Sequence, residues 1–160
     1  MKRINLLVLL ISLIANSSFA QVSNHKIIGV WQVDSPNLAD AWLSNYRFFK
    51  DGTFKYTFNQ YDDRGRIREA KGTYTLKDGT LTVIIKTRTE FIGGDLVGGG
   101  AGFQKEELVL DGGKPIEVKQ KIIEPIVFNI EWFIKKGVRG FKIQNNTYYL
   151  ISTDPHKEEN

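Results

Sequence analysis

The chain has 160 residues, with 22 Lys and Arg, 18 Asp and Glu, and no Cys. The lack of Cys excludes thiol nucleophiles and Cys-based metal sites. Lys2 and Arg3 lie in a segment that we expect to be removed, which leaves 20 basic minus 18 acidic residues, a net charge of +2. So small a charge gives no reason to expect a nucleic-acid partner or an anionic membrane surface.

Residues 1–20 have the three parts of a secretory signal peptide. Lys2 and Arg3 form the positive segment, Ile4–Ala15 is almost wholly apolar, and Ser18-Phe19-Ala20 supplies small residues for signal peptidase. A membrane anchor is the alternative, but about 20 apolar residues are needed to cross a bilayer. We therefore expect cleavage after Ala20, no integral membrane span afterwards, and a periplasmic or secreted protein. Residues 21–160 fit a single domain.

Residues 27–153 predict an all-β domain, because apolar and polar residues alternate along them. Asp-Gly pairs at 51–52, 78–79 and 111–112 tolerate positive φ and predict hairpins between neighbouring strands. Ser35 and Pro36 suit the start of a helix, so we expect one short helix over Pro36–Asn45, after the first strand. The expected strands span 27–33, 46–50, 53–61, 67–77, 81–91, 103–110, 114–123, 126–134, 138–144 and 147–153.

This order of elements predicts an antiparallel up-and-down β-barrel of about 8–10 strands. The third Asp-Gly pair is expected to join 103–110 to 114–123 as a hairpin. Six of the ten residues over 93–102 are Gly, and no Gly-Lys-Ser/Thr follows them. We therefore expect a mobile portal loop or an inert flexible loop there, and no phosphate-binding loop.

Gly29-Val30-Trp31 on the first strand resembles the Gly-x-Trp signature of the lipocalin and calycin barrels. The segments 49–54 and 72–81 are similar to the lipocalin-like domains of secreted bacterial proteins. The resemblance implies a barrel in which Gly29 allows a tight bend, and in which Trp31 plugs the floor against a basic side chain. Arg139 is one candidate for that basic residue. The chain lacks the Thr-Asp-x-x-Tyr signature of the family.

The period of two places a set of aromatic side chains on the inner face of the barrel, where they form either a ligand site or simply the core. These residues are Trp31, Phe54, Tyr56, Phe58, Tyr74, Phe128 and Trp132. Thr87, Thr89 and Gln120 share their parity, which indicates either a wet or ligand-filled interior or a position at the rim. Arg139 has three interpretations: it binds a ligand carboxylate, stacks on Trp31, or is exposed.

No catalytic constellation is visible, and two isolated histidines near the chain ends, His25 and His156, rarely make a metal site. We therefore expect neither an enzyme nor a cofactor. The favoured hypothesis is a lipocalin-like protein that binds a small apolar or amphipathic molecule in the barrel interior. The alternative is an interaction module that binds a protein or glycan on its outer face and has a packed core. Cavity volume distinguishes the two.

Overall fold

The computed structural model describes residues 26–36, 43–60, 65–98 and 108–157, which form an all-β fold. The expected signal peptide over 1–20 lies outside these residues, as does most of the expected helix over Pro36–Asn45. Asn45 itself begins a strand. The strands are β1 (Gly29–Val33), β2 (Asn45–Phe48), β3 (Thr53–Thr57), β4 (Ile67–Lys77), β5 (Thr80–Ile92), β6 (Asp95–Gly98), β7 (Leu108–Asp111), β8 (Lys114–Lys119), β9 (Pro125–Lys135), β10 (Val138–Ile143) and β11 (Asn146–Ser152).

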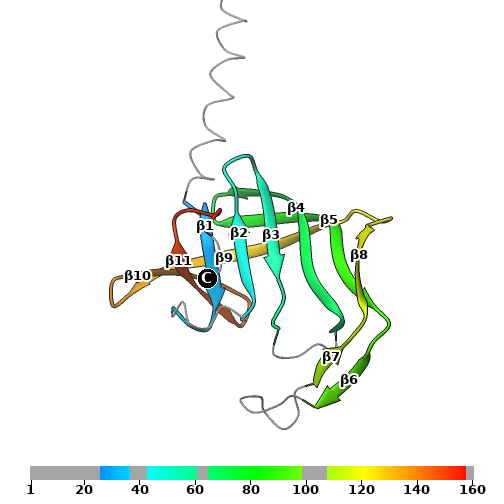
Figure 1. Cartoon of the computed structure of the whole chain (residues 1–160). Helices are drawn as coiled ribbons and strands as arrows, with labels where there is room; N and C mark the ends of the chain where they lie inside the picture. Colours follow the sequence, from blue (N-terminus) through cyan, green and yellow to red (C-terminus); the bar gives the residue numbers. More distant parts are fainter. Residues whose placement is uncertain (1–25, 37–42, 61–64, 99–107, 158–160) are drawn as a thin grey trace, which may run out of the picture.

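Eight of these strands close into a ring, each antiparallel to its neighbours. The order around the ring is β1, β2, β3, β4, β5, β9, β10 and β11, and β11 pairs again with β1. Figure 1 shows β1 to β5 side by side, with β9 crossing behind them. Ring neighbours are consecutive strands of the chain except between β5 and β9 and at the closure. The predicted antiparallel barrel is confirmed, with eight strands in its wall.

Residues 93–124 interrupt the meander between β5 and β9. β6 and β7 pair with each other in a separate sheet, which lies below the barrel in Figure 1. β8 pairs with the second half of β5, whereas β9 pairs with the first half. The predicted hairpin between 103–110 and 114–123 is therefore wrong, because these segments join different sheets. Part of the expected glycine-rich loop forms β6, and residues 99–102 lie outside the described residues.

Short turns connect the strands at one end of the barrel, which we call the closed end. Asp78 and Gly79 have φ values of 49° and 79°, as a two-residue type I′ hairpin requires. Residues 136–137 make a similar turn between β9 and β10. Between β2 and β3, Asp51 Oδ1 accepts hydrogen bonds from the Thr53 amide at 2.9 Å and from its hydroxyl at 2.6 Å. The Asp-Gly pairs at 51–52 and 78–79 thus form the predicted hairpins.

Two glycines allow neighbouring backbones to approach closely. Gly29 has a φ of 134°, and a Cβ at this position would lie 2.3 Å from the Ser152 carbonyl oxygen, where β1 meets β11 to close the ring. A Cβ on Gly72 would lie 1.8 Å from the Ile84 carbonyl oxygen, between β4 and β5. Both contacts are far too short for any side chain, so glycine is required at each position.

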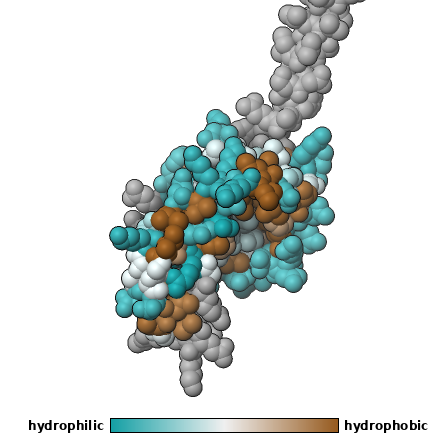
Figure 2. Space-filling view, turned by 90° about the vertical axis from the view of Figure 1, so that its right-hand side faces the viewer, coloured by the Kyte–Doolittle hydropathy of each residue, from teal (hydrophilic) through white to brown (hydrophobic). Residues whose placement is uncertain are grey.

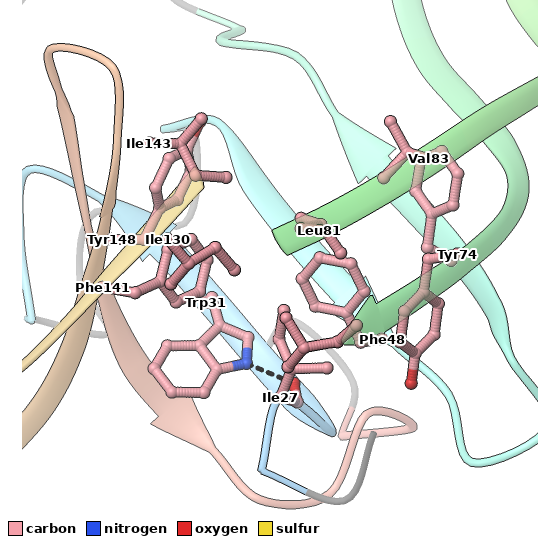
Figure 3. Packing of buried hydrophobic residues seen from close by; sticks show 12 residues of the cluster. Ile27, Trp31, Phe48, Tyr74, Leu81, Val83, Ile130, Phe141, Ile143 and Tyr148 are labelled. Atoms are coloured by element: carbon pink, nitrogen blue, oxygen red, sulfur yellow. Dashed lines mark hydrogen bonds between the residues drawn. The ribbon is translucent and has the colours of Figure 1, made fainter. Parts of the chain in front are cut away.

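The core fills the closed end and the middle of the barrel. Trp31 is completely buried, and its Nε1 donates a 2.6 Å hydrogen bond to the Ile27 carbonyl (Figure 3). Its indole ring lies edge-on to Trp132, with 5.7 Å between the ring centroids, and 4.9 Å from the ring of Phe141. The other members of the buried cluster come from all round the ring: Phe48, Phe54, Tyr74, Leu76, Leu81, Val83, Ile130, Ile143 and Tyr148.

Candidate ligand-binding site

The two ends of the barrel differ in their connections. Short turns join the strands at the closed end. At the opposite end three connections are long: residues 34–44 join β1 to β2, residues 58–66 join β3 to β4, and residues 93–124 lead from β5 to β9, whereas the turn at 144–145 between β10 and β11 is short. We call this the open end. Long connections around one mouth of a barrel are a common setting for a ligand site.

A cavity of about 210 Å³ lies inside the barrel at the open end. Seven of the eight ring strands, all except β1, contribute residues to its wall. Two further lining residues, Phe58 and Gln144, directly follow β3 and β10. The wall is mainly apolar, with aliphatic groups from Ala70, Val83, Ile85, Ile126 and Ile143. Six aromatic residues also line it, namely Tyr46, Phe54, Tyr56, Phe58, Phe128 and Tyr148, and two amide residues, Gln144 and Asn146, complete the wall.

Three tyrosines from β2, β3 and β11 gather at this cavity. The ring centroid of Tyr46 lies 4.4 Å from that of Tyr56 and 5.3 Å from that of Tyr148. Burial raises the pKa of both Tyr46 and Tyr148 well above the usual range, and the neighbouring phenols raise it further. These two hydroxyl groups are therefore neutral at physiological pH. A neutral phenol both donates and accepts hydrogen bonds, so the cavity can hold an apolar molecule that carries a small polar group.

A second pocket, of about 410 Å³, adjoins the cavity at the mouth of the barrel. Both share Phe58, Ala70, Ile85 and Ile126, so the two spaces are adjacent. Arg88, Gln120 and Glu124 add polar and charged groups to the outer part of the mouth pocket. Two further isoleucines, Ile67 and Ile122, also line it. The guanidinium of Arg88 forms an ion pair with the Glu90 carboxylate. Charged side chains therefore line the mouth pocket, whereas the cavity is lined by uncharged residues.

Four of the predicted aromatic residues meet in the cavity: Phe54, Tyr56, Phe58 and Phe128. Trp31, Tyr74 and Trp132 also belong to the interior packing, but they lie outside this cavity. The Tyr74 hydroxyl donates a 2.9 Å hydrogen bond to the Phe49 carbonyl. Burial, together with the nearby Asp51 carboxylate, raises the pKa of Tyr74 to about 12. For Trp31 and Tyr74 the alternative that they belong to the core therefore describes the structure better.

The prediction that Thr87 and Thr89 face inward is wrong. The register between β4 and β5 shifts at Lys86, after which Thr87 pairs with Lys71 on the outer face. One extra residue in a strand moves every later side chain to the opposite face of the sheet. Thr87 therefore lines an outer groove beside Lys71, and Arg88 takes the inward position at the mouth pocket.

Gln120 and Arg139 lie at opposite ends of the barrel. Gln120 lines the mouth pocket, so it is at the rim, and its backbone N–H donates a 2.9 Å hydrogen bond to the Lys86 carbonyl. Arg139 is exposed near the closed end, where it lines a separate pocket together with two other predicted residues, Trp31 and Trp132, and away from those at the open end. The basic group stacked on an indole ring is that of Lys26, whose Nζ lies 4.5 Å from the Trp132 ring centroid.

Sequence reasoning missed most of the aliphatic wall and several polar residues of the site, among them Tyr46, Arg88 and Tyr148. Tyr46 alternates with Phe48, and Tyr148 with Leu150, so the period of two could have placed both tyrosines inside. Arg88 could not be found in this way. Its inward position depends on the bulge at Lys86, which the alternation pattern does not reveal.

Comparison with known proteins assigns no family to this chain. No protein-family model matches it, and no match was found among curated proteins or solved structures. In the part of the chain that the structure describes, no three His, Asp or Glu side chains are grouped so that they could hold a metal ion. Within the same residues, no helix has the length and hydrophobicity to cross a membrane.

Proposed function

We propose that this chain is a lipocalin-like barrel that binds a small, largely apolar molecule at its open end and performs no catalysis. The observation that carries the proposal is the aromatic cavity of about 210 Å³, adjacent to a mouth pocket of about 410 Å³. Ligand sites are typically apolar spaces of roughly 300–1,000 Å³ with a few polar groups. The cavity and mouth pocket together fall in this range.

The polar groups of the site favour a ligand with one weakly polar end. Tyr46 and Tyr148 offer neutral hydroxyl groups inside the cavity, and Arg88 is already paired with Glu90 at the mouth. A hydroxyl or carbonyl group of the ligand would hydrogen-bond to the phenols, while its hydrocarbon part would contact Phe54 and Phe128. A buried polar group that keeps a hydrogen-bond partner avoids a penalty of about 1–3 kcal/mol.

The proposed location is the periplasm or the extracellular space. It rests on residues 1–20, with their positive segment, apolar segment and small residues before the cleavage point. Binding in such a compartment would serve capture or transport of the ligand, since no catalytic group is proposed.

Native mass spectrometry of the protein purified from its own host tests the proposal. We expect an additional bound mass that organic solvent removes. In Ala70→Leu, the larger side chain occupies space shared by the cavity and the mouth pocket, so the bound mass should be lost. Thr75→Leu is the matched control, because Thr75 is an exposed residue of the same strand. Circular dichroism would verify that both variants are folded.

Two results would contradict the proposal. One is a wild-type protein that shows no bound mass and no affinity for neutral apolar probes such as N-phenyl-1-naphthylamine. The other is an Ala70→Leu variant that is folded and binds as well as the wild type does.

A second candidate function is an interaction module that binds a protein or glycan. The observation that favours it is a set of exposed aliphatic residues around β8 and the start of β9: Ile116, Ile122, Ile123, Ile126 and Val127. Ile122 has 76% of its surface exposed. Figure 2, which views the molecule from the side of β8, shows several hydrophobic areas among hydrophilic ones. Apolar surface of this kind can mark a docking site.

Cross-linking distinguishes the two candidates. Val127 is exposed but lines neither the cavity nor the mouth pocket. If the exposed aliphatic residues bind a partner, a photoreactive residue at position 127 should give a discrete cross-linked product in the native host. A photoreactive residue at exposed position 77 should give none. Ligand binding at the open end predicts no product at either position.

A further inference from the structure

A separate pocket of about 430 Å³ lies near the closed end of the barrel. It is lined by the side chains of Lys26, Trp31, Trp132, Phe133, Ile134 and Arg139. None of these residues lines the open-end cavity or the mouth pocket. Two indole rings, a phenyl ring and an isoleucine give the pocket a mainly apolar wall. Ile134 is 74% exposed and Trp132 is half-buried, so this part of the wall is accessible from solvent, whereas Trp31 is completely buried behind it.

The charged residues that line this pocket are both cations. Lys26 Nζ lies 4.5 Å from the centroid of the Trp132 ring, and Arg139 pairs with Ile134 across the β9–β10 hairpin. Among the described residues, no carboxylate forms an ion pair with Arg139. Lys135 and Lys136 lie in the same hairpin and add to the local positive charge. An anion at this pocket would therefore meet attraction from both lining cations.

We propose that this pocket is a second binding site, specific for an apolar or aromatic molecule with one carboxylate or sulfonate group. The ring system of the ligand would contact Trp132 and Ile134, and its anionic group would bind the Arg139 guanidinium and the Lys26 ammonium. A guanidinium can bind a carboxylate or sulfonate through two parallel hydrogen bonds. This site is independent of the open-end site, which offers neutral phenols and binds uncharged polar groups.

Two fluorescent probes differ in the feature that the site would recognise. 8-Anilinonaphthalene-1-sulfonate carries a sulfonate, and N-phenyl-1-naphthylamine has the same aromatic rings without it. We expect the double variant Lys26→Gln/Arg139→Gln to bind the sulfonate probe about tenfold more weakly, since each charge-assisted contact is partly screened by solvent. Its affinity for the neutral probe should not change. Lys142→Gln is the matched control, because Lys142 is an exposed cation of the same strand that does not line the pocket.

The Ala70→Leu variant separates this proposal from the proposed function. It fills space at the open end and should leave the charge-dependent binding of the sulfonate probe intact. The proposal is overturned if the double variant binds the sulfonate probe as well as the wild type does, or if Lys142→Gln weakens binding equally. It is also overturned if the neutral probe loses affinity in parallel, or if Ala70→Leu alone abolishes sulfonate binding. Failure of these tests would leave binding of a neutral ligand at the open end unaffected.

Discussion

Replacement of Trp31 by Phe tests whether the buried indole stabilises the core at the closed end of the barrel. The indole is completely buried, and its Nε1 donates a 2.6 Å hydrogen bond to the Ile27 carbonyl. Phe cannot donate this bond, which leaves the buried carbonyl without its partner at a cost of about 1–3 kcal/mol. The smaller ring also removes about three heavy atoms from the core, worth about 2 kcal/mol at ~0.8 kcal/mol per carbon group. The free energy of unfolding should fall by about 3–5 kcal/mol.

Urea unfolding followed by far-ultraviolet circular dichroism measures this loss. A decrease of about 4 kcal/mol with an unchanged slope of about 2 kcal/mol per molar urea would lower the midpoint by about 2 M. Trp132→Phe is the matched control, because Trp132 is only half-buried and packs edge-on to the same indole. We expect this control to lose about 1–2 kcal/mol. The proposed role of Trp31 in the core would be refuted if the free energy of unfolding of Trp31→Phe fell by less than about 1 kcal/mol, or by no more than that of the control.

Three further predictions concern single residues of β4. Gly72→Ala should lower the free energy of unfolding by over about 2 kcal/mol in urea, because its Cβ would lie 1.8 Å from the Ile84 carbonyl oxygen. Gly98→Ala, which meets nothing within 4 Å, should cost little, and equal losses would contradict this explanation. Burial raises the pKa of Glu69, but the Lys55 and Lys71 ammonium groups outweigh it and hold the pKa below its usual value. Its contribution to stability is therefore present above that usual value and is lost as the pH falls through the lowered pKa. Glu69→Gln should be less stable by about 0.5–1 kcal/mol at neutral pH and equally stable in acid, by urea unfolding at about pH 7 and pH 3; a difference that persists in acid would count against the ion pairs. Burial and Asp51 raise the pKa of Tyr74 to about 12, so its contribution is lost as the pH rises from 10.0 to about 12. Tyr74→Phe should therefore lose less stability than the wild type over this pH interval, as measured by urea unfolding, with phenolate absorbance to follow the ionisation. An equal loss in the variant and the wild type would argue against a buried phenol at this position.

Local pattern was sufficient to predict the wall of the barrel. The strands β4, β5, β9, β10 and β11 lie within a few residues of their expected ranges, because a half-buried strand must alternate apolar and polar side chains. Asp78-Gly79 predicted its hairpin because few residues tolerate two successive positive φ angles. These features depend on the residues themselves and their near neighbours.

Prediction failed where pairing depends on residues far apart in the chain. Asp111-Gly112 has the composition of a hairpin, yet β7 pairs with β6 and β8 pairs with β5. β8 has no buried residue, so its alternation does not specify a partner. The same limit applies to the site, since the bulge at Lys86 reversed the faces of Thr87 and Arg88.

The sequence by itself determined an antiparallel all-β chain with aromatic side chains on one face, because alternation and turn chemistry act over a few residues. Only the tertiary structure decided which aromatic residues became core and which line a cavity. Trp31 and Tyr74 have the same parity as Tyr56 and Phe58, but the first two lie outside the cavity at the open end. The physical reason is that a cavity depends on how side chains from seven strands pack against one another, and the pattern within a single strand does not determine that packing.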